Sequence, residues 1–152
     1  MLNDSHRTRL RIAMRLIDEK MAAIESRLAH PDERRLMFEV NNDLTADLEQ
    51  KLRAQLEAVY RLIAALKNRF ELSREIRPAS RDILQGLPQL WVMLQESDSK
   101  HLRGYGRLDP ADHAALDPQI QQLATLVLQM ESLMLGNRTA TAPAVNESER
   151  SC

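Results

Sequence analysis

The sequence predicts an all-α fold class: a four-helix-bundle-like domain over residues 1–136, with a kinked third helix, and a disordered C-terminal tail over residues 137–152. Three observations favour this class. Aromatic residues make up only 3% of the chain, whereas β-strands are usually rich in aromatic and β-branched residues. The four glycines are too few for the many tight turns of an all-β fold. Four long segments carry apolar residues at helical spacing, and short links join them.

The first predicted helix spans residues 5–29 and ends before Pro31. Its apolar residues recur every three or four positions, which places them on one stripe of a helix. Residues 31–44 follow as a short helix or an ordered linker, because the extended alternative for "LMFEV" has no convincing partner strand. The stripe consists of Leu10, Met14, Ile17, Met21, Ile24 and Leu28.

The second predicted helix spans residues 45–71, and residues 72–80 connect it to the next. Thr45 is a suitable N-cap, and Asp47 and Glu49 suit the positive N-terminal end of a helix. The apolar stripe of this helix consists of Leu48, Leu52, Leu56, Val59, Ile63, Leu66 and Phe70.

The third predicted helix spans residues 80–102 and contains Pro88. Proline removes one backbone donor and crowds the carbonyl of Leu84, so we expect a kink or break near Gly86–Pro88. Such a kink would open a groove beside Trp91. A small-molecule pocket at this place stays an open alternative.

The fourth predicted helix spans residues 118–135, after a loop over residues 103–117. Its start signal is Asp117-Pro118, an acidic cap followed by proline at the first helical position. Gly136 ends it, and the small, polar residues that follow indicate the tail. The predicted stripe is Ile120, Leu123, Val127, Met130 and Met134.

The composition favours a cytoplasmic protein without a membrane partner. Cys152 is the only cysteine, so no intrachain disulfide can form, which fits a reducing compartment. The first residues lack the apolar core of a signal peptide, and no apolar run approaches the roughly 20 residues of a membrane span.

His101 is the first candidate for chemistry. The segment from His101 to Gly104, "HLRG", resembles the His-x-Leu-Lys-Gly motif of histidine-phosphotransfer domains, which are four-helix bundles with a phospho-accepting histidine. The leucine, the basic residue and the glycine each come one position early here. A slip of one residue rotates a helical side chain by about 100°, so the cation would point away from the phosphoryl group. We therefore interpret His101 as a histidine that suits the negative end of a helix, and phosphotransfer as a remote alternative.

A metal site is the second remote alternative. Asp98 and His101 are three residues apart, and His113 and Asp117 are four apart, so each pair would share one face of a helix. The sequence contains no Glu-x-x-His pair of the kind found in di-iron bundles. Nothing in it indicates a Ser-His-Asp set or a complete phosphate-binding loop. We predict no enzyme, no metal and no cofactor.

Basic residues crowd the start of the first helix. Residues 1–16 contain four arginines against one acidic residue. Cations at a helix N-terminus oppose the helix dipole, so helix stability does not explain them. Arginine suits phosphates and carboxylates. An anionic partner, an acidic protein or less favourably a nucleic acid, is therefore the alternative function, with Arg7, Arg9, Arg11 and Arg15 as its binding residues.

The strongest signal for function is the absence of charge from two segments of the C-terminal half. Residues 83–95 and 118–130 contain no charged side chain. A helix that is apolar around much of its circumference is buried on more than one side. We therefore predict a non-enzymatic interaction or regulatory protein, adaptor-like, that binds a protein partner or forms a homodimer through helices 3 and 4. The predicted contact residues are Trp91, Val92, Met93, Leu126, Leu128 and Leu133.

Overall fold

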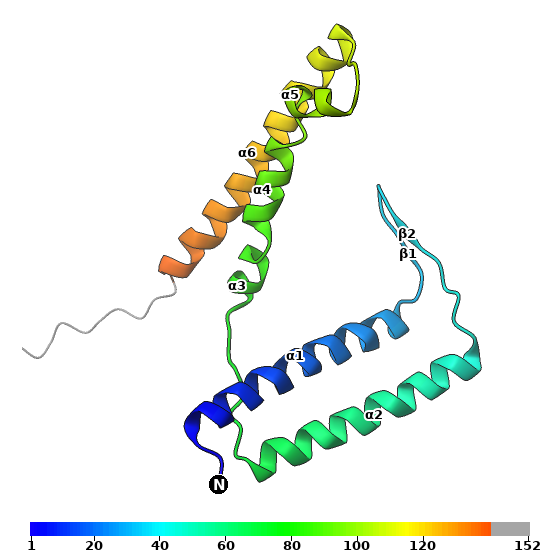
Figure 1. The fold of residues 1–152 in the computed structure, drawn as a ribbon, viewed down its shortest axis with the longest axis vertical. Helices are drawn as coiled ribbons and strands as arrows, with labels where there is room; N and C mark the ends of the chain where they lie inside the picture. The colour runs from blue at the N-terminus through cyan, green and yellow to red at the C-terminus, as the bar shows by residue number, and fades with distance from the viewer. Residues whose placement is uncertain (141–152) are drawn as a thin grey trace, which may run out of the picture. The chain divides into compact units, whose positions relative to one another are not determined.

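The computed structural model describes residues 1–140, with side chains described as far as residue 136. The chain divides into two compact units, Met1–Glu75 and a second unit that begins at Ile76. The predicted helical character is confirmed, since strands occupy only a short hairpin within the described residues. A four-helix bundle is not confirmed, because each unit contributes one antiparallel helix pair (Figure 1). The single domain over residues 1–136 stays a prediction.

The first unit is a pair of long helices, α1 (Asp4–Ala29) and α2 (Ala46–Arg69). The side chain of Asn3 caps α1 by accepting a hydrogen bond from the His6 backbone N–H, and Thr45 caps α2 as predicted. Residues of both predicted apolar stripes lie between the helices. Leu28 from α1 and Leu56 from α2 are each buried, and Leu72 is buried just beyond the end of α2.

A β-hairpin joins α1 to α2, so the short helix expected over residues 31–44 is wrong, and the ordered linker expected as the other possibility contains two short strands. Strand β1 (Glu33–Arg34) pairs with the antiparallel strand β2 (Glu39–Val40), and Glu33 lies opposite Val40. The partner strand was missed because it lies directly before "LMFEV" and is charged, so it has no apolar alternation. The Asn42 backbone N–H donates to the Asp32 carboxylate at 2.8 Å and fixes the base of the hairpin.

In the second unit, three helices replace the single kinked helix that we expect over residues 80–102. They are α3 (Ala79–Leu84), α4 (Leu87–Gln95) and α5 (Ser99–Leu102), and a 3₁₀ turn, η1 (Arg103–Tyr105), follows. Gly86 has a left-handed backbone with φ 91°, which ends α3. Pro88 then lies in the first turn of α4, where its missing N–H leaves no hydrogen bond unmade, so it does not kink the helix.

The last helix, α6 (Pro110–Ala140), is longer at both ends than predicted. It begins at the first of the two Asp-Pro steps and continues through Pro118, although Pro118 carries the expected start signal. It also continues past Gly136, so residues 137–140 are helical rather than part of a tail. The rest of the predicted tail, residues 141–152, lies outside the described residues.

Candidate protein interface

Helix α4 lies antiparallel beside α6 (Figure 1). From α4, Leu87 is buried, while Trp91 and Leu94 are half-buried. From α6, Ala124 is 2% exposed, the lowest value among the buried residues of the described chain. The inward stripe of α6 therefore passes through Ala124. Leu123 and Met130, which belong to the predicted stripe, are exposed instead.

The residues that directly precede the inward positions share one side of the α4–α6 pair. A step of one residue turns a helical side chain by about 100°. Because the two helices are antiparallel and both right-handed, the preceding residues turn toward the same side on both helices. Most of them are large, apolar and exposed, whereas Gly86, which precedes the buried Leu87, has no side chain. We call this side the Leu–Met face; it consists of Leu90 and Met93 from α4 and Leu123, Leu126, Met130 and Leu133 from α6.

The residues that directly follow the inward positions turn to the opposite side of the pair. Three of these are exposed and apolar, namely Val92, Leu128 and Leu135, and they are mixed with polar positions such as Thr125 and Ser132. This opposite side is therefore less continuous than the Leu–Met face.

The predicted contact residues consequently occupy three places. Trp91 is half-buried on α4. Met93, Leu126 and Leu133 belong to the Leu–Met face, whereas Val92 and Leu128 lie on the opposite side. Sequence reasoning missed Leu90, Leu123 and Met130, because helical spacing alone assigned Leu123 and Met130 to the core of the unit.

The four arginines near the start of α1 differ in what they bind. The Arg15 guanidinium pairs with Glu19 at 2.9 Å and with Glu75 at 2.7 Å. Arg11 donates a hydrogen bond to the Ser73 hydroxyl at 3.2 Å. Arg15 and Arg11 therefore already hold the first unit together.

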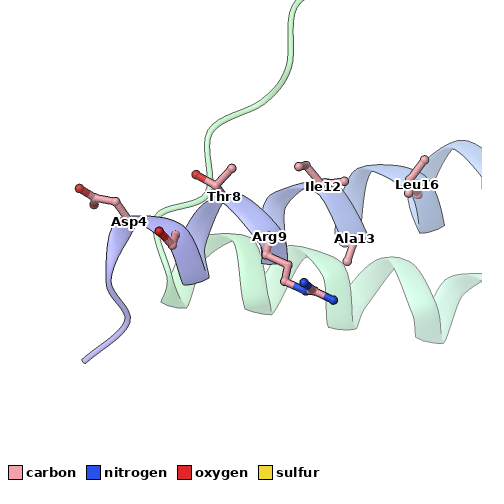
Figure 2. Close-up of a pocket in the computed structure, with 7 residues that line it drawn as sticks. Asp4, Thr8, Arg9, Ile12, Ala13 and Leu16 are labelled. Carbon is pink, nitrogen blue, oxygen red and sulfur yellow. The ribbon is translucent and has the colours of Figure 1, made fainter.

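Arg7 and Arg9 have no such partners within the described chain. The Nε atom of Arg7 is buried without a hydrogen bond, and Arg7 and Arg69 both line a hollow of about 330 Å³. Arg9 belongs to a wide, open hollow along α1. Figure 2 shows that Ile12 and Leu16 point to one side of α1 while Arg9 points to another. Arg9 is therefore exposed to an anionic partner, whereas Arg7 is only half-exposed and its Nε atom is buried.

His101 belongs to a capping arrangement. Its backbone N–H and its Nδ1 both contact the Asp98 carboxylate, at 2.9 Å and 2.6 Å, so Asp98 caps α5. These hydrogen bonds, the backbone one first, hold the pKa of Asp98 below its ordinary value.

A second carboxylate ties α5 to α6. Asp117 accepts hydrogen bonds from the Ser99 hydroxyl at 2.7 Å and from the Ser99 backbone N–H at 2.8 Å. The hydroxyl bond first, then the backbone bond, lowers the pKa of Asp117. Both carboxylates thus act as structural acceptors. Among the described residues, no group of three or more histidine, cysteine or acidic side chains is arranged to hold a metal ion.

The tip of the β-hairpin is a further apolar feature that sequence reasoning missed. Leu36 and Met37 are 101% and 93% exposed, and Phe38 is also exposed. Turns favour Gly, Pro, Asn and Asp, none of which is present in "RLMF". The missing turn residues are the signal that could have drawn attention to this segment.

Comparison with protein-family models finds no match, and comparisons with curated proteins and with solved structures find none either. No helix among the described residues is both long and apolar enough to cross a lipid bilayer.

Proposed function

We propose that this chain is a small, non-enzymatic, cytoplasmic interaction or regulatory protein that binds another protein through the apolar surface of α4 and α6. The observation that supports the proposal is the exposure of large apolar side chains on both sides of a helix pair that carries no charge over residues 83–95 and 118–130. The contact residues are Trp91, Val92, Met93, Leu126, Leu128 and Leu133.

The free energy of binding would come from removing the apolar side chains of this surface from water. The exposed side chains of the proposed set keep between 44% and 68% of their area accessible. Covering that area would contribute on the order of 1 kcal/mol for each side chain. Few charged groups would lose water in the process, so little of this gain would be offset. Exposed apolar patches of this kind mark protein interaction sites in other proteins.

Photo-crosslinking in cells tests this function even while the partner is unidentified. A photoreactive residue would replace Met93, Leu126 or Leu128 in turn, with Gln55 on α2 as the matched exposed position outside the surface. We expect protein adducts from the three surface positions and none from position 55. Absence of adducts from all three surface positions would contradict the proposal.

The alternative function, binding to an anionic partner, is favoured by the free guanidinium of Arg9 and the unpaired Nε atom of Arg7. Binding to poly-glutamate or to a DNA duplex should then weaken as salt rises. The Arg7→Ala/Arg9→Ala variant should lose it. Arg11→Ala should lose less, because Arg11 already bonds Ser73. Salt-independent or absent binding would dispose of this alternative.

A further inference from the structure

We propose that the partner at this surface is a second copy of the chain, seated on the Leu–Met face through a two-fold axis. This inference rests on the proposed function and names its partner. Each copy would contribute α4 and α6, so that the dimer forms a four-helix arrangement between chains.

The apolar residues that α6 contributes to the Leu–Met face are regularly spaced along the helix. Leu123, Leu126, Met130 and Leu133 follow one another at steps of three, four and three residues. That spacing is the one that lines up apolar residues along the seam between packed helices. Leu90 and Met93 on α4 widen the same side. The described chain thus presents a seam, but buries these side chains only in part.

The absence of charged residues from the Leu–Met face also favours a second copy as the partner. A two-fold axis brings the same surface of two copies together, so any charge on it would face a like charge. The Leu–Met face carries none. An uncharged apolar face is complementary to itself.

The surface area that two copies would bury also favours a dimer. If each of the six side chains offers on the order of 100 Å² to a partner, two copies together would bury roughly 1,200 Å². That area is at the lower end of the range for stable, specific interfaces. The polar residues around the face would add to it.

Sedimentation of the purified full chain over a concentration series tests the inference. We expect twice the mass of one chain. Leu126 and Leu128 offer a matched pair of substitutions, since they are 44% and 45% exposed on opposite sides of the α4–α6 pair. Leu126→Glu should raise the dimer dissociation constant at least about 100-fold, because the dimer would bury two carboxylates. Leu128→Glu should leave the dissociation constant within about threefold of the original chain.

Circular dichroism controls for folding, because a variant that loses its helices says nothing about the interface. If Leu126→Glu loses helicity, the milder Leu126→Gln variant takes its place and should still weaken the dimer.

The outcomes separate this inference from the proposed function. A chain that stays monomeric at every concentration overturns the second copy, and crosslinks from position 126 to another protein would then leave the proposed function standing. A monomer without any crosslinks overturns both. A dimer that survives the change at position 126, or that is disrupted equally at position 128, overturns the seam on the Leu–Met face.

Discussion

At the scale of single residues, the core of each unit consists of very few buried apolar side chains. Only Leu28, Leu56, Leu72, Leu87 and Ala124 are buried apolar residues among those described. The predicted stripes of α1 and α2 locate the first two correctly, since helical spacing identifies an inward face. Ala124 could not be found in this way. A small side chain gives little hydrophobic signal, although Ala124 is the least exposed of the buried residues in the described chain.

Two leucines on α2, one buried and one exposed, test which apolar residues form the core of the first unit. Leu56 is 5% exposed and Leu62 is 65% exposed. We expect Leu56→Ala to lower the free energy of unfolding by about 2–5 kcal/mol, because it removes buried methyl groups and leaves a cavity. Leu62→Ala should change it by less than about 0.5 kcal/mol. Urea unfolding followed by circular dichroism measures both, and equal losses would contradict the packing of α1 on α2.

The caps around α5 predict a dependence on pH. The pKa values of Asp98 and Asp117 lie below the ordinary 3.8 in the folded chain, so both groups stabilise the fold above pH 3.8. That contribution is lost as the pH falls through the folded-state pKa. We therefore expect the melting temperature to drop below pH 3.8, and Asp117→Asn to make this drop smaller. Asp112→Asn is the control, since no hydrogen bond in the described chain uses its carboxylate. An unchanged profile in Asp117→Asn would contradict the capping role.

At the scale of elements, boundaries depend on backbone conformation as much as on periodicity. The apolar pattern over residues 83–94 is continuous, but the left-handed Gly86 divides it between α3 and α4, and the extended backbone of Asp98 separates α5 from α4. Pro118 shows the opposite case. Its start signal is a weak preference, and the helix continues through it because Asp117 is engaged with Ser99 instead.

Substitutions at two glycines test the break before α4 and the continuation of α6 separately. Gly86→Ala should lower the free energy of unfolding by about 1–2 kcal/mol, because a side chain disfavours the left-handed backbone. Gly136→Ala should raise it by about 0.5–1 kcal/mol, because alanine favours the helix interior that position 136 occupies. No atom lies within 4 Å of an added Cβ at either site, so only the backbone is tested. Chemical unfolding of the two variants measures both values, and a stabilised Gly86→Ala variant would contradict the break before α4.

At the scale of the whole molecule, the chain consists of two small units, each with few buried apolar residues. A single helix pair can cover only one face of each helix, so the other faces remain exposed to solvent or to a partner. The exposed residues that follow α2 connect the two units.

The connection between the units predicts a site of proteolysis. Arg74 is exposed, and no helix or strand covers residues 73–78. We expect limited trypsin digestion to cut early after Arg74 and to release fragments of residues 1–74 and 75–152. Arg74→Gln should remove this cut and leave the other early fragments unchanged. Mass spectrometry of the products identifies the cut sites. Early cuts confined to α1 or α2 would contradict the division into units.

The sequence alone determined the helical class, the paired stripes of α1 and α2 and the two uncharged segments over residues 83–95 and 118–130, because each depends on composition and local spacing. Only the tertiary structure decided the division into two units, the hairpin, the break between α4 and α5 and the side of α6 on which each apolar residue lies. The physical reason is that a helix that is apolar all round has several equivalent inward faces. Contact with α4 selects one of them, and the Leu–Met face is what that choice leaves exposed.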